Sequence, residues 1–376
     1  MSETKRLAVL VASLANGGIG KMRLNLINEF VRQGVAVDLL VADRESPYMG
    51  RLDPSVRLFK LNTSHAVNSI PALYRYLRRE RPDAMLTQRI RVNVAALRAR
   101  RLARSRVPIY VTLNTNLSAQ LESMPPRKRS RQLAKLRRFY PLNDGLIAVS
   151  RGVAEDAAAL IGIDVDRIRP IANPVVTPAL FRGAEASANH PWLDGKSKPV
   201  LLAVGRLEPQ KDFGTLLEAF ARLRDEHEAR LIILGEGKLR ESLQARAVEL
   251  GIADDLAMPG FVDNPAAFMA RADLFVLSSR WEGSPNSLTE AVALGTPVVA
   301  TDCPNGPSEI LENGRYGELV AMGDSAGLAA AMARALVSPP DAAFLRQAGE
   351  RYTVERSARG YLRAMNLSPV AEQPAA

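Results

Sequence analysis

The sequence predicts an α/β protein of two domains, each a parallel sheet covered by helices. Three observations favour this class. Short runs of aliphatic and β-branched residues alternate with helix-forming segments, the pattern of parallel strands joined by crossover helices. The chain has 376 residues, enough for two domains with separate cores. The alternation restarts near residue 198, after a proline-rich stretch at 171–181 that suits an interdomain linker.

The predicted elements follow in order along the chain. The apolar run at 6–14 is expected to form the first strand, and a glycine-rich turn leads from it into a helix that ends at Gly34. Further strands of the first half are expected at 35–42, 83–88, 108–114 and 144–150. In the second half we expect strands at 198–205, 229–235, 272–279 and 297–302, and helices at 215–227 and 237–251. Ligands of such folds bind at the carboxyl ends of the strands, so a ligand cleft is expected between the two domains.

Composition narrows the class of protein. Apolar residues make up 47% and charged residues 24%, as in soluble globular proteins. No apolar run approaches the roughly 18 residues of a membrane span, and the first one has strand length without a signal-peptide cleavage site. The single cysteine, Cys303, excludes an internal disulfide and suits a reducing compartment. We therefore expect a cytoplasmic protein. This location is compatible with peripheral contact between the protein and the inner face of the cytoplasmic membrane.

Basic residues concentrate in the first half of the chain. Residues 75–138 hold 18 Lys and Arg but only three Asp and Glu, in two basic groups at 75–106 and 127–138. Solvated helix faces are the ordinary explanation of such groups. A field of this size also attracts anionic membranes, at about 1 kcal/mol per basic residue. Nucleic acid fits the same field, but no reading motif or aromatic platform accompanies the charge, so none is expected as a partner.

Glycine-rich and basic turns follow several predicted strands. The stretch ANGGIGK at 15–21 does not match the P-loop motif. Two explanations of its Gly17 and Gly18 stay open: they let backbone amides approach an anion, or they only allow a tight turn between strand and helix. In GRLEPQKDF at 205–213, Arg206 and Lys211 suit a diphosphate, although single surface cations are more often merely solvated. The turns LGEGKL and MPGFVDN expose backbone groups at the same end of the sheet.

The stretch EGSPNSLTE at 282–290 carries two glutamates eight positions apart. Ser287 and Glu290 match a capping box, so capping of a helix is one explanation of Glu290. Glu282 precedes that helix, and a carboxylate there would accept hydrogen bonds from a polyhydroxyl ligand. The backbone amides of Asn286, Ser287 and Leu288 at the helix start would favour a phosphate. The stretch therefore suits a nucleotide-sugar.

These motifs together resemble a known family, the retaining GT-B glycosyltransferases of glycosyltransferase family 4. The resemblance rests on the E-x7-E pattern from Glu282 to Glu290, the following EAVALGTPVVATDCPNGPSEIL, and the order of GRLEPQKDF, LGEGKL, GFVDN, I-x-NPV and RYTVERSARGYL. It is close over about 170–365 and looser before that. It implies two doubly wound Rossmann-like domains facing across a cleft, and a hexosyltransferase that needs no metal or other cofactor.

The resemblance also implies roles for individual residues. Arg206 and Lys211 would neutralise the diphosphate leaving group, and Glu282 would hold donor-sugar hydroxyls, so these three are the expected catalytic residues. The expected donor-binding residues are Gly18 near the phosphates, Phe261 near the base, Asn286, Ser287 and Leu288 at sugar and phosphate, and Glu290 at the ribose.

One position departs from the family pattern. Many relatives carry a histidine after a first-domain strand, where this chain has Asn114 in VTLNTNLSAQ. Asparagine can hydrogen-bond a sugar hydroxyl but cannot act as a base, so Asn114 is either an acceptor-side contact or only a turn residue. The histidines present, His65, His190 and His227, match no such position.

The expected organisation is an acceptor-binding domain at 1–172, a nucleotide-sugar-binding domain at 173–352, a C-terminal helix at 353–368 that crosses back to the first domain, and a flexible tail at 369–376. The expected reaction moves a sugar from a UDP- or GDP-type donor to a lipid-linked or anionic glycan acceptor, in polysaccharide, lipopolysaccharide or glycolipid synthesis. The alternatives are a nucleotide-sugar-binding protein without turnover, and a basic membrane or nucleic-acid adaptor on the same fold.

Overall fold

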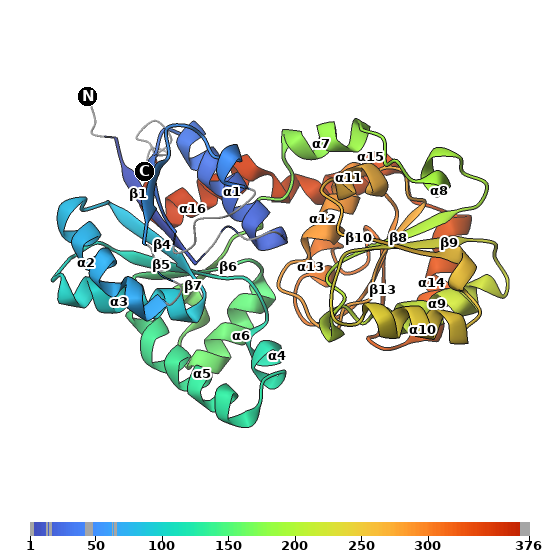
Figure 1. Cartoon of the computed structure of the whole chain (residues 1–376), viewed down its shortest axis with the longest axis horizontal. Coiled ribbons are helices and arrows are strands. Elements are labelled where there is room, and N and C mark those ends of the chain that lie inside the picture. The colour runs from blue at the N-terminus through green and yellow to red at the C-terminus, as the bar shows by residue number, and fades with distance from the viewer. Residues whose placement is uncertain are drawn as a thin grey trace. The chain divides into compact units, whose positions relative to one another are not determined.

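The computed structural model describes residues 4–12, 14, 17–41, 48–61, 63 and 66–368. These residues form two compact units (Figure 1). Unit 1 comprises Met1–Pro174 and Val354–Ala376, and unit 2 comprises Val175–Thr353. None of the helices in the described ranges is long and apolar enough to cross a membrane.

Unit 1 contains a parallel sheet. In sheet order its strands are β3 (Arg57–Lys60), β2 (Ala36–Val41), β1 (Arg6–Val11), β4 (Ala84–Gln88), β5 (Ile109–Leu113), β6 (Gly145–Ala148) and β7 (Ile168–Pro170). Its helices are α1 (Gly18–Arg32), α2 (Ile70–Arg79), α3 (Ile90–Leu102), α4 (Leu117–Glu122), α5 (Pro126–Phe139), α6 (Arg151–Ile161) and α16 (Val354–Ala364). The central strands are buried on both faces, which explains their continuous apolar runs.

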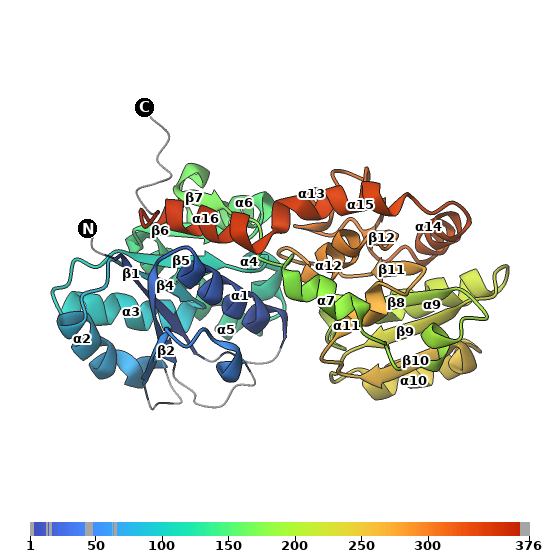
Figure 2. The ribbon, with the colours of Figure 1, turned by 90° about the horizontal axis from the view of Figure 1, so that it is seen from above.

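Helices cover both faces of this sheet. Helices α1 and α16 pack on one face, and α2 to α6 pack on the other. Helix α16, the last one in the chain, lies beside α1 in unit 1 (Figure 2), where the rings of Phe30 and Tyr361 are 6.3 Å apart. Ser357 Oγ also donates a hydrogen bond of 2.7 Å to the carbonyl of Ala172. The chain therefore returns to unit 1 after completing unit 2.

Unit 2 contains a second parallel sheet. In sheet order its strands are β10 (Leu256–Gly260), β9 (Arg230–Leu234), β8 (Val200–Val204), β11 (Leu274–Leu277), β12 (Val298–Thr301) and β13 (Glu318–Val320). Its helices are α7 (Pro178–Glu185), α8 (Pro191–Asp194), α9 (Phe213–Arg224), α10 (Arg240–Glu249), α11 (Pro265–Met269), α12 (Asn286–Leu294), α13 (Pro307–Ile310), α14 (Ser325–Val337) and α15 (Ala342–Gly349). Helices α9, α10 and α14 cover one face, and α11 and α12 lie on the other (Figure 1).

Two expectations about this part of the chain are corrected. The proline-rich stretch at 171–181, expected to be a linker, is helical in its last four residues, because α7 begins at Pro178. The side chain of Thr177 caps this helix by accepting a hydrogen bond from Leu180 N. The helix expected at 237–251 begins only at Arg240, since Gly237 lies against the backbone of Leu207.

Candidate functional site

Three loops of unit 2 join at the carboxyl ends of β8, β9 and β10. Gly205 N donates to Leu234 O at 2.9 Å, Gly235 N donates to Gly260 O at 2.8 Å, and Leu207 N donates to Glu236 O at 2.9 Å. The loops GRLEPQKDF, LGEGKL and MPGFVDN are therefore tied by their backbones into one surface. Phe261, the first residue after β10, is 54% exposed on that surface.

Lys211 and Glu282 meet in a nearly buried ion pair. Lys211 Nζ lies 2.5 Å from Glu282 Oε1, and the two side chains are only 15% and 10% exposed. Ser279 Oγ donates to the same carboxylate oxygen at 2.7 Å. Lys211 ends a short 3₁₀ turn after β8, and its carbonyl accepts from Ser278 Oγ at 2.8 Å. Adjacent strands β8 and β11 thus bring together residues 71 positions apart in sequence.

Further bonds hold the loop after β8 against the loop after β11. Arg280 N donates to Gln210 O at 2.8 Å, and Gln210 Nε2 donates to Trp281 O at 2.8 Å.

The buried thiol of Cys303 lies close enough to Glu282 for the carboxylate charge to affect its pKa. Burial, as the main cause, and the negative charge of Glu282, as the second, raise the pKa of Cys303 to about 12. The thiol therefore stays protonated and is not a nucleophile.

Arg206 differs from Lys211. Its side chain is 70% exposed, and its Nη1 lies 3.6 Å from Glu208 Oε2. A pair at this distance and exposure contributes little to stability, so the guanidinium is free to change partner. The structure therefore fixes Lys211 beside Glu282 and leaves Arg206 at the solvent-exposed side of the same loop.

Helix α12 begins within the E-x7-E stretch. Pro285 occupies its N-cap position and makes no side-chain capping bond, and the helical hydrogen bonds start with Thr289 N, which donates to Pro285 O. The amides of Ser287 and Leu288 therefore precede the hydrogen-bond ladder at the positive end of the helix. The capping-box interpretation of Ser287 and Glu290 is wrong, because Glu290 is the fifth residue of α12. Its side chain is buried.

The unit 1 candidates lie at the carboxyl edge of the other sheet. Gly18 is the first residue of α1, and Asn114 directly follows β5 and is half-buried. Gly17, with φ 113°, has a backbone that favours glycine, while residues 15 and 16 of the ANGGIGK stretch lie outside the described residues. Asn116, not Asn114, caps α4 by accepting from Ala119 N at 2.7 Å.

Both halves of the chain match known protein families. Residues 189–352 match the family described as "Glycosyl transferases group 1", and residues 16–177 match "Glycosyltransferase Family 4". The second match ends at residue 177, just past the boundary between the units after Pro174, and the two matches together take in most of the chain.

The chain belongs to glycosyltransferase family 4.

Curated relatives of this family 4 chain include the lipopolysaccharide core biosynthesis glycosyltransferase LpsE of Rhizobium meliloti, 30% identical over 63% of this chain and 66% of LpsE. An uncharacterized glycosyltransferase of Methanocaldococcus jannaschii is 40% identical over 31% of this chain and 29% of its own length. The chain thus spans less than two thirds of each of these relatives. Among solved structures, Anabaena HepE in complex with UDP and glucose has a TM-score of 0.78 and 18% identity over 96% of this chain and 99% of HepE. This likeness shows the fold, which is of the GT-B type.

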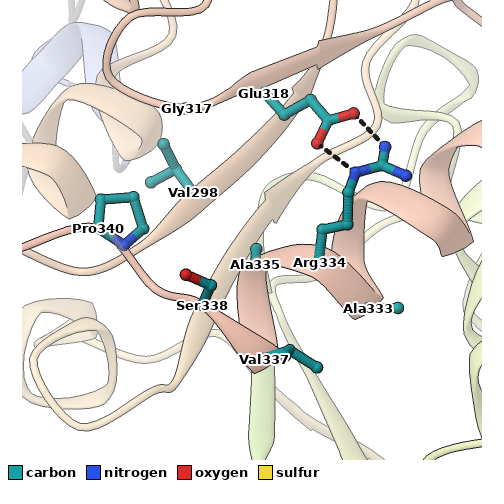
Figure 3. Close-up of a pocket in the computed structure, with 9 residues that line it drawn as sticks. All are labelled: Val298, Gly317, Glu318, Ala333, Arg334, Ala335, Val337, Ser338 and Pro340. Atoms are coloured by element: carbon teal, nitrogen blue, oxygen red, sulfur yellow. Dashed lines mark hydrogen bonds and ion pairs between the residues drawn. The ribbon is translucent and has the colours of Figure 1, made fainter.

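A surface hollow on the family 4 chain lies away from these residues. It measures about 500 Å³ and is lined by residues of β12, β13 and the end of α14 (Figure 3). An ion pair between Glu318 and Arg334 borders it. The lining includes none of the motif residues, so the hollow is no part of the candidate site.

Sequence reasoning missed two residues that shape the candidate site of this family 4 chain. Ser279 was expected only as the end of a strand, and Gln210 was not singled out at all. No sequence signal identifies either, because their importance comes from hydrogen bonds to Glu282 and Trp281. His190 and His227 lie outside the site: the first caps α8 through its Nδ1, and the second follows α9. His65 lies outside the described residues.

Gly235 provides a test of the loop architecture. A Cβ on this residue would lie 1.9 Å from the carbonyl oxygen of Gly205, and its φ of 138° disfavours any side chain. We expect Gly235→Ala to lower the free energy of unfolding of unit 2 by about 2–3 kcal/mol, measured by thermal denaturation. Gly214→Ala is the matched control, because Gly214 has open space around it. Equal stability of the two variants would contradict the tight packing of these loops.

Proposed function

We propose that the chain is a retaining, metal-independent glycosyltransferase that moves a sugar from a UDP- or GDP-type nucleotide-sugar to a glycan acceptor. The observation that carries this proposal is the buried Lys211–Glu282 pair beside the start of α12. It sets a cation and a carboxylate, which can accept hydrogen bonds from sugar hydroxyls, just before the first turn of α12. Relatives named for lipopolysaccharide core synthesis, and a structural neighbour bound to UDP-glucose, support the same chemistry.

Lys211 and Arg206 stabilise the leaving group in this proposal. The bond between the anomeric carbon and the diphosphate breaks, and negative charge develops on the departing phosphate oxygen. Two cations and the amides at the start of α12 stabilise that charge. The acceptor hydroxyl bonds to the anomeric carbon on the face that the diphosphate leaves. Its proton passes to the departing phosphate oxygen, so no protein base is needed and Asn114 in place of histidine is compatible with turnover.

The ion pair does not prevent Lys211 from binding a phosphate. An ammonium group carries three N–H donors, and Glu282 Oε1 accepts from only one of them. Lys211 can therefore keep Glu282 in place and donate to a phosphate oxygen at the same time. Glu282 retains a second carboxylate oxygen for donor-sugar hydroxyls, and Glu290 is proposed to accept from the ribose.

Ligand-induced stabilisation tests the donor part of the proposal. Thermal denaturation is followed with UDP, GDP, dTDP and ADP in turn. A ligand at 100 times its dissociation constant stabilises the native state by about 2.7 kcal/mol, and we expect one nucleotide to give such a shift. A panel in which no nucleoside diphosphate raises the melting temperature of the wild type would contradict the proposal.

We also propose that unit 1 contacts anionic membranes, where a lipid-linked acceptor would reside. The contact surface is formed by exposed cations of α3 and α5, which we call the basic surface: Arg98, Arg101, Arg127, Lys128, Arg129, Arg131 and Arg138. Arg98 of α3 and Arg138 of α5 both stack on Phe139, so the two helices present their charge together. Leu102 and Leu142, 64% and 55% exposed, supply apolar side chains beside it.

Vesicle binding checks this contact. Replacing Arg127, Lys128 and Arg131 by glutamine should weaken binding to phosphatidylglycerol vesicles by roughly 100-fold, at about 1 kcal/mol per charge. The control replaces three exposed arginines of unit 2, Arg182, Arg222 and Arg346, and should bind nearly as the wild type. Equal losses in both variants, or tighter binding to RNA than to vesicles, would contradict the proposed membrane contact.

A further inference from the structure

We propose that Arg240 is a positioning residue that fixes a bulge in β10 and, through this bulge, holds the exposed ring of Phe261 for the base of the nucleotide. The inference rests on the proposed function for its ligand, but its structural part is measured without any ligand. Arg240 is the first residue of α10, and a short loop joins it to the carboxyl end of β9.

Strand β10 contains the bulge just before Phe261. Its register against β9 shifts between Ala257 and Gly260, so that the two intervening residues lie opposite a single residue of β9. A bulge bends its strand and redirects the side chains that follow, and bulges are common beside active sites. The second of the two residues is Pro259, which has no N–H to donate to the sheet. The sheet alone therefore holds this segment with fewer bonds than a regular strand.

The guanidinium of Arg240 binds the bulge and the neighbouring loop. Its Nη1 donates to the carbonyl oxygen of Met258, inside the bulge, at 2.9 Å. Its Nη2 donates to the carbonyl oxygen of Gly235 at 3.2 Å, and Gly235 N donates to Gly260 O at 2.8 Å. Arg240 and the loop after β9 therefore hold the bulge from both sides of Pro259.

Glu236 fixes the orientation of this guanidinium. Arg240 Nε donates to Glu236 Oε2 at 2.9 Å, and Nη2 donates to Oε1 at 2.6 Å. Two parallel bonds of this kind set the plane of the guanidinium. The pair also packs against the bulge, because a Cβ on Gly260 would lie 2.7 Å from Glu236 Oε1. A partly exposed ion pair contributes little stability by itself, so its main effect here is to direct Arg240 at the two carbonyl oxygens.

Phe261 is the side chain that this arrangement positions. It directly follows Gly260, and it is more exposed than any other aromatic side chain of the described residues. An exposed aromatic ring offers a stacking face to a flat base. Leu207 N donates to Glu236 O, so the loop that carries Arg206 and Lys211 is bonded to the same surface. One surface therefore offers a ring for the base and two cations for the diphosphate.

Lysine cannot replace arginine in this role. The guanidinium makes four hydrogen bonds to two carbonyl oxygens and a carboxylate, whereas an ammonium group is a point charge with three donors. Arg240→Lys thus keeps the charge but loses the bonds that fix the bulge. Arg246→Lys is the matched control. Arg246 lies on the same helix and pairs at the surface with Glu218 and Glu249, and no bond joins it to β10 within the described residues.

Hydrogen exchange of the full chain without ligand tests the structural part. We expect Arg240→Lys to speed exchange of the Gly235 amide by about tenfold, because its bond to Gly260 opens more readily once the bulge is released. Exchange in Arg246→Lys should match that of the wild type. Equal exchange in all three proteins would overturn the role of Arg240.

Calorimetric titration tests the effect on the ligand. The two ligands are the nucleoside diphosphate that gives the largest thermal shift, and inorganic pyrophosphate, which has no base. Arg240→Lys should weaken binding of the nucleoside diphosphate roughly tenfold, as when one stacking contact is lost, and change pyrophosphate affinity less than about twofold. A lower melting temperature with an unchanged ratio of the two affinities would show a purely structural role and overturn the proposal.

A double variant shows whether Arg240 acts through Phe261. Phe261→Ala should weaken nucleoside diphosphate binding about as much as Arg240→Lys, and the double variant should bind no more weakly than Phe261→Ala alone. Losses that multiply would overturn this link. A wild type that binds no nucleoside diphosphate would refute the proposed function and the role at the base. Faster exchange in Arg240→Lys would then still establish that Arg240 fixes the bulge.

Discussion

Lys211→Ala is expected to lower the rate of sugar transfer by about 100- to 1,000-fold. This is the usual loss when one preorganised group that stabilises developing negative charge is removed. The same variant should bind UDP or GDP more weakly, since the cation meets the diphosphate in the ground state too. Steady-state kinetics and calorimetric titration measure the two effects.

Lys198→Ala is the matched control for that experiment. Lys198 precedes the amino end of β8, whereas Lys211 follows its carboxyl end, and it forms a surface pair with Glu228 at 3.3 Å. Its replacement should leave kinetics and nucleotide affinity near the wild-type values. If Lys211→Ala behaved like this control, Lys211 would not contact the diphosphate.

Glu282→Ala should show a different pattern from Lys211→Ala. Its carboxylate is proposed to hold the sugar, so the affinity for a nucleotide-sugar should fall more than the affinity for the nucleoside diphosphate. Removal of the carboxylate also leaves the Lys211 ammonium without its partner in a nearly buried position. Thermal denaturation of the variant separates this structural loss from the binding effect.

Asp38→Ala is expected to cost unit 1 about 3 kcal/mol of unfolding free energy, because it removes the centre of a buried polar cluster. Asp38 is fully buried in β2, and its carboxylate accepts from Arg6, from Arg57 and from the Tyr76 hydroxyl, the last at 2.7 Å. The two arginines are partly exposed and can regain water, which limits the loss. Denaturant unfolding measures the change, and Glu155→Gln on the exposed side of α6 is the control.

The effect of Asp38 should depend on pH in a defined direction. Burial alone would raise the pKa of Asp38, but hydrogen bonds from Arg57 and Tyr76 and the nearby positive charges hold it below its ordinary value. A carboxylate with a lowered folded-state pKa stabilises the protein fully above its unfolded-state pKa of about 4, and this contribution disappears as pH falls through the folded-state value. The stability difference between wild type and Asp38→Ala should therefore shrink below about pH 4. A difference that grew on acidification would contradict this account.

The interior strands could be predicted from sequence, and the edge strands could not. The runs that became β1, β4, β5, β8 and β11 are continuous and apolar because both of their faces are buried. Strand β3 is largely exposed and β10 is partly exposed, so their residues form no continuous apolar run. Edge strands β7 and β13 have only three residues each.

The site could be predicted as a set of loops but not as a set of contacts. Parallel strands place their carboxyl ends on one edge, which is why Arg206, Lys211, Glu282 and Phe261 were expected at a common surface. Lys211 and Ser279 both donate to the same oxygen of Glu282. These contacts form because β8 and β11 are neighbours in the sheet. Sequence order does not reveal that neighbourhood. The helix start expected at Asn286 is confirmed, whereas the capping-box alternative fails because the N-cap is Pro285 and Ser287 already lies inside α12.

Release of the nucleoside diphosphate tests the central claim most directly. The wild-type chain is incubated with the nucleotide-sugar whose nucleotide gives the largest thermal shift, and free nucleoside diphosphate is quantified over time with and without glycan acceptors. We predict slow release without acceptor, faster release with a suitable one, and strongly reduced release in Lys211→Ala and Glu282→Ala. Tight donor binding without any release from the wild type across a broad acceptor panel would contradict the account and identify a nucleotide-sugar-binding protein instead.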